Sequence, residues 1–256
     1  MRFTVENMEF YLLVLVRMSA FVLSAPFLNY SAIPVRMKAG ISILLSIVVI
    51  QVIPVVPLSY SGIVGFSVLV LKETVVGLVL GFMCNVCFYI VSFSGQIMDM
   101  QMGLSMANMY DPATNIQVTV TGNIYNYFLM LMLVVTNMHY YIIRAITDSF
   151  SYFNVGQAVF RMELKDVMLN FMGNYFLIAL RIVLPVFCCM LLIHVILGVL
   201  TKAAPQMNMF SIGLQIQVFV GIILLILLVQ TLPMVSDFIF SEMKEVITQV
   251  IHVFTP

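Results

Sequence analysis

The sequence predicts an all-α integral membrane protein, built from helical hairpins in which several helices are broken. Hydrophobic residues make up 62% of the 256 residues, charged residues only 9%, and the mean hydropathy is +1.12. A soluble domain carries about a quarter charged residues, so this composition is typical of a membrane protein. Long apolar segments alternate with short polar linkers, and two of these segments exceed the roughly 20 residues that one crossing needs.

The composition also argues against a nucleic-acid partner, a cleavable signal peptide and a disulfide framework. Eleven basic and eleven acidic residues cancel, so no nucleic-acid partner is expected. Tryptophan is absent, which leaves tyrosine for the membrane interfaces. We expect no cleavable signal peptide, because Glu6 and Glu9 follow Arg2 closely. Four cysteines in such a chain predict no disulfide framework.

The first expected helix covers residues 10–28 and carries Arg17 near its middle. A charge at that depth costs at least about 2.5 kcal/mol and must face protein or water. An ion pair with a neighbouring helix is favoured over a charge that lines a transport pathway. A linker at 29–38 follows, and the second expected helix covers 39–56 before Pro57.

The third expected helix covers residues 63–93 and is longer than one crossing. It holds the adjacent charges Lys72 and Glu73. Gly77 and Gly81 are spaced four apart, so they share one helix face and predict close packing against another helix.

Cysteine and histidine predict no catalytic or metal site. Cys84 and Cys87 form a C-x-x-C pair on the third helix, but apolar neighbours favour core packing over metal binding. His194 stands alone on an apolar helix. No catalytic spacing of histidine, serine or acidic residues occurs, so we expect no enzyme, no metal and no cofactor.

A methionine-rich stretch at 95–122 separates the third helix from the next. Five methionines fall between Met98 and Met109, followed by small polar residues and a proline. It is expected to be a functional polar loop. The alternative is that its methionines have no special role, because the whole chain contains 21 of them. The fourth expected helix covers 124–143, and a polar, water-exposed connection at 147–166 then divides the chain.

The second half predicts a helical hairpin. Residues 167–200 again exceed one crossing, contain Arg181, and are expected to bend at Pro185. A tight linker at 201–210 leads to a further helix at 212–232. An amphipathic helix at 234–254 ends the chain, with an apolar face made of Val235, Phe238, Ile239, Val246, Ile247, Val250, Ile251 and Phe254.

A simple count of crossings conflicts with the charges of the linkers. Basic linkers should lie in the cytoplasm. If each segment crosses once, the linkers that carry Arg36, Lys38 and Lys202 lie on one side of the membrane. The stretch at 95–122, which has no Lys or Arg, falls on that same side, and the basic connection at 147–166 falls on the opposite side. We therefore expect broken helices, or helices buried against protein rather than lipid.

Five motifs in order resemble the FliR family of flagellar export-gate proteins and their virulence type III secretion counterparts. They are Ser-Ala-Pro-Phe at 24–27, Ile-Pro-Val-Arg-Met-Lys at 33–38, Gly-Gln-Ile-Met-Asp-Met-Gln-Met-Gly-Leu-Ser at 95–105, Asp-Pro-Ala at 111–113 and Leu-Gly-Val-Leu-Thr-Lys-Ala-Ala-Pro-Gln-Met at 197–207. The resemblance covers nearly the whole chain. It is their combination and spacing that is specific.

The resemblance implies a division into a FliP-like part at 1–165 and a FliQ-like hairpin with its amphipathic helix at 166–256. It implies assembly with FliP-like and FliQ-like subunits into a channel for unfolded secreted flagellar proteins, next to FlhB-like and FlhA-like export components and membrane lipid. The implied location is the bacterial inner membrane at the flagellar basal body, with much of the assembly raised towards the periplasm. The alternatives are the same role in a virulence injectisome, or a polytopic small-molecule transporter.

The resemblance also implies roles for particular residues. The stretch matching the family's channel plug is 106–122, where Met106, Met109 and Tyr110 replace aromatic side chains of some relatives. The implied plug and gasket residues are Met102, Met106, Met109, Tyr110, Asp111, Pro112, Ile116 and Val118. The implied loop hinges are Gly95, Gly103 and Gly122; the hairpin tip is Lys202, Pro205 and Gln206; and the intramembrane charges are Arg17, Lys72, Glu73 and Arg181.

Overall fold

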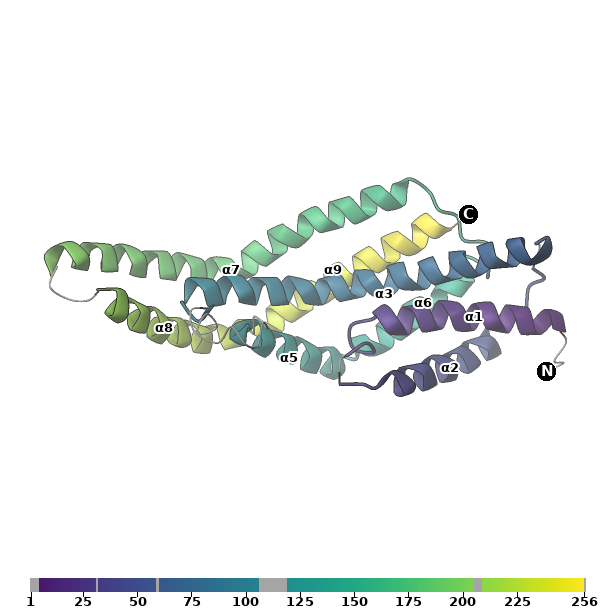
Figure 1. Ribbon diagram of the computed structural model, residues 1–256, viewed down its shortest axis with the longest axis horizontal. Helices are drawn as coiled ribbons and strands as arrows, with labels where there is room; N and C mark the ends of the chain where they lie inside the picture. The colour runs from purple at the N-terminus through teal and green to yellow at the C-terminus, as the bar shows by residue number, and fades with distance from the viewer. Residues whose placement is uncertain (1–4, 31, 59, 106–118, 205–208, 256) are drawn as a thin grey trace. The chain divides into compact units, whose positions relative to one another are not determined.

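The computed structural model describes residues 5–30, 32–58, 60–105, 119–204 and 209–255, and within them every regular element is a helix (Figure 1). The elements are α1 (Val5–Ser24), α2 (Val35–Val52), α3 (Gly62–Gln101), α5 (Val120–Val135), α6 (Met138–Tyr152), α7 (Glu163–Ala203), α8 (Met209–Leu228), the short 3-10 helix η1 (Val229–Thr231) and α9 (Leu232–Phe254). In this part of the chain, five helices are long and apolar enough to cross a membrane, or six if the bent pair α5–α6 forms one span. The prediction of an all-α membrane protein is confirmed.

The chain forms two compact units, and α3, α5, α7 and α9 contribute to both. The first unit holds Met1–Cys87, Leu133–Phe171 and Phe240–Pro256, and the second holds Phe88–Met132 and Met172–Ile239. This is a division by packing. The division into FliP-like and FliQ-like parts at residue 165 concerns ancestry and stays a prediction.

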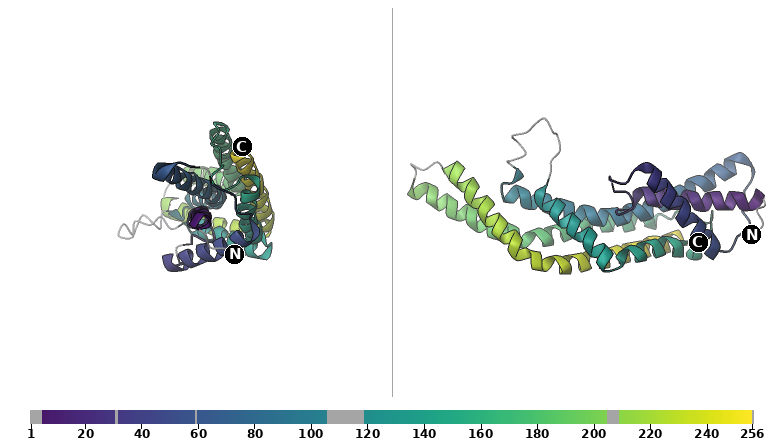
Figure 2. Two further views of the ribbon diagram at one scale, coloured as in Figure 1. Left: turned by 90° about the vertical axis from the view of Figure 1, so that its right-hand side faces the viewer. Right: turned by 90° about the horizontal axis from the view of Figure 1, so that it is seen from below.

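The first unit is a helix bundle, in which α1 and α2 lie side by side (Figures 1 and 2). The buried apolar residues of α1 recur every three or four positions, from Phe10 through Val14 and Met18 to Phe21. That spacing gives α1 an apolar stripe facing the core. Close approach to α3 occurs at Gly77 and Gly81, where an added Cβ would overlap atoms of α1. The prediction of close packing at these glycines is confirmed.

The second unit contains the end of α3, α5 and the helices α7 and α8. Its buried cluster joins Ile90 of α3 to Ile178 and Ala179 of α7. The predicted hairpin is present: the views agree that the neighbouring stretches of α7 and α8 lie side by side, and a Cβ at Gly213 of α8 would lie 3.4 Å from Leu197 of α7 (Figures 1 and 2). α7 continues through Pro185 as one helix.

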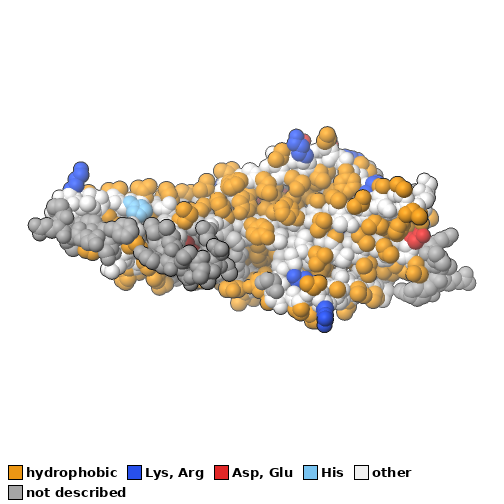
Figure 3. Space-filling model, viewed as in Figure 1, with side chains coloured by type: hydrophobic (Ala, Val, Ile, Leu, Met, Phe, Trp, Pro, Cys, Tyr) orange, Lys and Arg blue, Asp and Glu red, His pale blue; other side chains and the backbone are white. Residues whose placement is uncertain are grey.

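The membrane helices differ in how far they are covered by their own chain. In α3 61% of the most apolar stretch is buried, against 17% in α7. Hydrophobic side chains dominate the face drawn in Figure 3, and the charges on it are few. α7 therefore presents apolar surface that requires lipid or another protein for cover.

Three helix boundaries differ from the sequence predictions. α3 runs to Gln101, so the start of the expected loop at 95 is helical. The expected single helix at 124–143 is instead α5 and α6, which are bent by 71° where Asn137 takes a left-handed conformation with φ 57°. Within the expected water-exposed connection at 147–166, Ser149 and Phe150 lie buried at the end of α6.

The amphipathic helix at the C-terminus is confirmed as α9. Its buried side contacts the protein core and its exposed side carries Asp237 and Lys244, so it packs within its own chain. Phe238 was placed on the apolar face from the sequence, but its side chain is 36% exposed. η1 joins α8 to α9, and Pro233 falls in the first turn of α9, where proline is tolerated.

Candidate functional site

The two helices that flank the candidate plug stretch touch through glycine. A Cβ added to Gly95 of α3 would overlap the Cα and N atoms of Gly122 in α5. Only a residue without a side chain permits this approach between two backbones. These glycines therefore have a packing reason to be glycine, and both lie inside helices.

Asp99 ties the end of α3 to the start of α5. The residue is 3% exposed, and its carboxylate accepts hydrogen bonds from the backbone N–H of Thr121, 3.2 Å from each oxygen, and from the hydroxyl of Thr121. The first N–H groups of a helix lack partners within the helix, and its N-terminus carries partial positive charge. The carboxylate of Asp99 thus caps α5 from outside that helix.

Met102 and Gly103 follow α3 directly and pack against α8. Met102 is fully buried, and a Cβ at Gly221 of α8 would come within 2.6 Å of its Cγ and Sδ atoms. Gly103 has φ +77°, and a Cβ there would lie 3.4 Å from Leu214 of α8. Gly103 is the one predicted hinge with left-handed backbone, which glycine adopts without strain.

The rest of the predicted plug lies outside the described residues: Met106, Met109, Tyr110, Asp111, Pro112, Ile116 and Val118. The same holds for Pro205 and Gln206 at the predicted hairpin tip, whereas Lys202 is exposed near the end of α7. The sealing and hinge roles stay predictions. What the structure adds is the geometry of the helices on which the plug stretch begins and ends.

Arg17 forms the ion pair that the sequence favours, and its partner is Glu73. The guanidinium Nε atom lies 2.5 Å from Oε2 of Glu73, and Nη2 lies 3.1 Å from Oε1. Both side chains are fully buried. Two predicted intramembrane charges, on α1 and α3, are therefore partners in one contact.

Neighbouring groups complete the hydrogen bonding of this pair. Nη1 of Arg17 donates to the hydroxyl of Ser149 at 3.1 Å, and the N–H of Gly156 donates to Oε1 of Glu73 at 2.7 Å. The guanidinium carbon lies 4.0 Å from the ring centroid of Phe150, a cation–π distance. Sequence reasoning missed Ser149 and Gly156, because they lie in a stretch whose polar composition resembled a solvated linker.

The other two predicted charges lie apart from this pair. Lys72 is half-buried and Arg181 is exposed on α7. Cys84 and Cys87 are buried free thiols, as core packing predicts. The described ranges contain no group of three or more side chains able to hold a metal ion.

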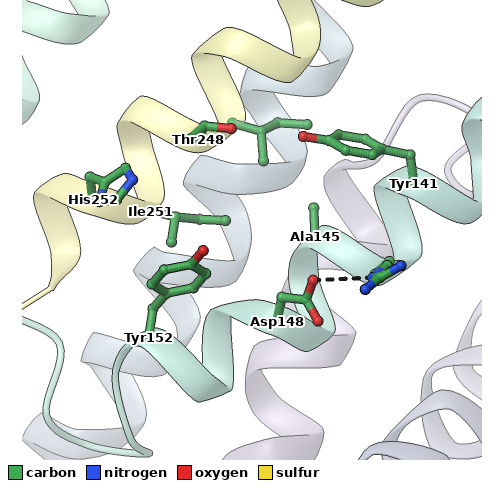
Figure 4. A pocket seen from close by; sticks show the side chains of 9 residues that line it. Tyr141, Ala145, Asp148, Tyr152, Thr248, Ile251 and His252 are labelled. Carbon is green, nitrogen blue, oxygen red and sulfur yellow. Dashed lines mark ion pairs between the residues drawn. The ribbon is translucent and has the colours of Figure 1, made fainter.

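A surface cavity of about 280 Å³ lies between α6 and α9 in the first unit (Figure 4). The Arg144 and Asp148 side chains form an exposed ion pair at its edge, with Nε of Arg144 3.4 Å from Oδ2 of Asp148. Tyr141 and Tyr152 line it from α6, and Thr248 and His252 line it from α9 (Figure 4). None of the residues that line it, all in the first unit, belongs to the described parts of the 95–122 stretch.

Comparison with known proteins identifies the family. Residues 8–243 match the family model described as bacterial export proteins, family 1. The chain belongs to this family. Its relatives include the flagellar biosynthetic proteins FliR of Bacillus subtilis (strain 168), 31% identical over 90% of each chain, and of Escherichia coli (strain K12), 27% identical over 95% of this chain and 93% of the relative. FliR of Borreliella burgdorferi is 30% identical over 83% of this chain and 79% of the relative. The resemblance to the FliR family is confirmed, and the matched residues include α3, α5 and the buried pair Arg17 and Glu73.

Proposed function

We propose that this FliR-family membrane protein is a structural, non-catalytic subunit of the flagellar protein export gate in the bacterial inner membrane. It assembles with FliP-like and FliQ-like subunits into a channel for unfolded secreted proteins, next to FlhA-like and FlhB-like components. The observation that carries the proposal is the family match over residues 8–243. All three relatives described above are named as flagellar proteins, which favours a flagellum over an injectisome.

Within the channel, the plug that seals it lies in the stretch at 106–122, with Met106 and Met109 among its apolar side chains. Methionine is apolar, unbranched and flexible, so it packs against varied neighbours. A narrow hydrophobic constriction blocks water and ions by dewetting. The contacts of Asp99 and Gly95 with the start of α5 support this role, because they hold the two ends of the segment close together.

The exposed apolar surface of α7 supports assembly with other subunits. Only 17% of its most apolar stretch is buried by its own chain, and it carries the exposed charge Arg181. A charge on an apolar membrane helix is disfavoured in lipid and favoured against protein. The small-molecule transporter has less support. Two of the four charges suited to a substrate site, Arg17 and Glu73, bind each other in a buried ion pair and do not face a substrate cavity.

The test is the purified complex of this chain with its FliP-like and FliQ-like partners, reconstituted in vesicles. Three forms are compared: the wild type, a deletion of residues 107–118, and a replacement of 107–118 by glycine and serine at equal length. We expect a discrete complex in every case, and higher ion flux from both variants than from the wild type.

The equal-length replacement separates loss of the apolar side chains from loss of chain length. Wild-type ion flux from both assembled variants contradicts the plug. A chain that purifies as a well-behaved monomer and takes up small solutes alone contradicts the export gate and favours a transporter.

A further inference from the structure

We propose that the cavity between α6 and α9 binds the headgroup of an acidic phospholipid. The lipid phosphate lies at the basic end of the cavity, beside Arg144 and Lys244, and the start of an acyl chain lies along its apolar floor. The site is built from residues of the first unit alone. It goes beyond the proposed role in protein export and does not depend on the sealing of a channel.

The cavity is a groove between one face of α6 and one face of α9 (Figure 4). Its lining residues recur at intervals of three and four positions, from Tyr141 to Tyr152 on α6 and from Ile247 to His252 on α9. Side chains at this spacing share one face of a helix. At a rise of roughly 1.5 Å per residue, the groove follows α6 for about 16 Å. It is therefore long enough to hold a polar group at one end and hydrocarbon further along.

The basic end of the groove lies at Tyr141. Nζ of Lys244 lies 5.3 Å from the ring centroid of Tyr141, and Arg144 lines the groove about one turn further along α6. Both basic side chains are exposed, so a ligand can reach them. At the other end the rings of Tyr152 and His252 meet edge to face, with their centroids 5.8 Å apart. Positive charge is thus concentrated at one end of the groove.

Asp148 is the acidic residue of the groove, and it orients Arg144 without occupying all of its donors. Its Oδ2 atom lies 3.4 Å from Nε of Arg144, in an exposed pair. A guanidinium has five N–H donors, so a contact at Nε leaves both terminal nitrogens available to a second anion. Such a planar fork binds phosphate in a bidentate manner. Arg144 and Lys244 together exceed the charge of Asp148 by one, which favours an anionic ligand.

The floor of the groove is apolar, because Ala145 lines it from α6 and Ile247 and Ile251 line it from α9. Two hydroxyl groups lie above this floor: in Figure 4 that of Tyr141 points towards Thr248, and that of Tyr152 points towards Ile251. Tyrosine is enriched where one end of the side chain is apolar and the other is wet, as at a membrane interface. The groove therefore offers hydrocarbon contact directly beside polar and charged groups.

An acidic phospholipid matches both parts of the groove in one molecule. A free phosphate ion would use Arg144 and Lys244 but would gain nothing from the apolar floor, whereas a phospholipid carries its phosphate next to hydrocarbon. Basic pockets between membrane helices bind anionic headgroups in this way. The volume of about 280 Å³ is close to the lower limit of ligand cavities, roughly 300 Å³. It suits a headgroup and the first carbons of a chain, with the remaining acyl chain in the bilayer.

The experiment labels the full-length protein, in the form in which it is extracted from the membrane, with a photoreactive phosphatidylglycerol. The probe carries a diazirine near the start of one acyl chain, and digestion followed by mass spectrometry locates the label. We expect label on residues 247–252 of α9. Unlabelled phosphatidylglycerol should compete for this site, and zwitterionic phosphatidylcholine should compete poorly because it lacks the net negative charge.

Two variants test the two halves of the site. Arg144→Gln combined with Lys244→Gln removes both cations from exposed positions and should lower labelling of α9 about tenfold, since charge-assisted bonds to phosphate are lost. Ala145→Phe fills the floor and keeps both cations, and it should also lower labelling. Arg161→Gln is the matched control, because Arg161 is an exposed arginine of the same unit that does not line the groove. Its labelling should equal that of the wild type.

Equal labelling of the wild type and of the Arg144→Gln, Lys244→Gln variant overturns the inference. If that variant is not recovered, Ala145→Phe decides, and unchanged labelling of Ala145→Phe overturns it. Phosphatidylcholine that competes as well as phosphatidylglycerol would show apolar contact without recognition of charge. Inorganic phosphate that displaces the probe at the same concentration would show a free-anion site. Absence of label from α9 only when other subunits are present would show that a partner protein covers the groove. Each of these three results overturns the lipid as its occupant.

Discussion

The guanidinium of Arg17 and the carboxylate of Glu73 form a two-point ion pair inside the first unit, with neither side chain exposed. The pair joins α1 to α3, and its bonds to Ser149 and Gly156 extend it to α6 and to the turn that follows. Every charge and hydrogen-bonding group in this cluster thereby gains a partner. Buried pairs of this kind are tolerated only when such additional hydrogen bonds are present.

Glu73→Gln is expected to destabilise the first unit strongly. The amide keeps the shape of the side chain but leaves the buried charge of Arg17 without a counterion, which typically costs about 3–5 kcal/mol. Chemical unfolding of the purified complex in detergent measures the loss. Asp148→Asn is the matched control, because its pair with Arg144 is exposed and worth at most about 1 kcal/mol. Equal effects of the two substitutions would contradict a structural role for the buried pair.

Composition and segment length predicted the membrane class, the order of the helices and the hairpin of α7 and α8. These depend on local apolarity, which the sequence carries directly. That Arg17 needs a partner was also predictable from its depth, since an unpaired charge there is too costly. Ser149, which accepts from Arg17, and Gly156, which donates to Glu73, were not predictable, because these contacts join residues 132 and 83 positions apart in the chain.

The stretch at 95–101 shows why a polar composition can hide a helix. Its buried residues Gly95, Met98 and Asp99, and Met102 directly after it, follow the three- and four-residue spacing of a helix, although one is charged and one is glycine. The break between α5 and α6 had a weaker local signal. Asn137 takes a left-handed conformation, which asparagine tolerates better than most residues, but asparagine alone does not predict a 71° bend.

Gly77→Ala is expected to force α1 and α3 apart. A Cβ there would overlap the carbonyl oxygen of Arg17 and approach the Ala20 Cβ to 2.9 Å. Backbone cannot move aside cheaply, so overpacking of about 1–3 kcal/mol is expected. Thermal unfolding of the complex measures it. The control is Gly40→Ala in α2, where no atom lies within 4 Å and a gain of roughly 0.5–1 kcal/mol is expected from helix propensity. A neutral Gly77→Ala would contradict the close approach.

Gly95→Ala is expected to lower the yield of the assembled complex more than Gly122→Ala does. The added methyl group at Gly95 meets the backbone of Gly122. At Gly122 the nearest atom is the Thr119 hydroxyl oxygen, the far end of a side chain. Adding Thr119→Ala to Gly122→Ala should therefore restore much of the lost yield, whereas adding Thr119→Ala to Gly95→Ala should restore none of it. Size-exclusion chromatography of the complex measures all four variants. Equal yields throughout would show that α3 and α5 are not held by glycine contact.

Tyr60 is expected to titrate later than an ordinary tyrosine because of Glu9. Its hydroxyl donates a hydrogen bond to the Glu9 carboxylate, which raises the pKa of Tyr60 above the usual 10.0, and the negative charge of Glu9 acts in the same direction. Because the folded-state pKa is raised, the contact stabilises the fold below about pH 10 and is lost as the pH rises through the folded-state pKa. Tyrosinate absorbance of the wild type minus that of Tyr60→Phe isolates this transition. Glu9→Gln keeps an acceptor but removes the charge, so it should move the transition to lower pH. A transition that stays in place in Glu9→Gln would rule out Glu9 as the cause.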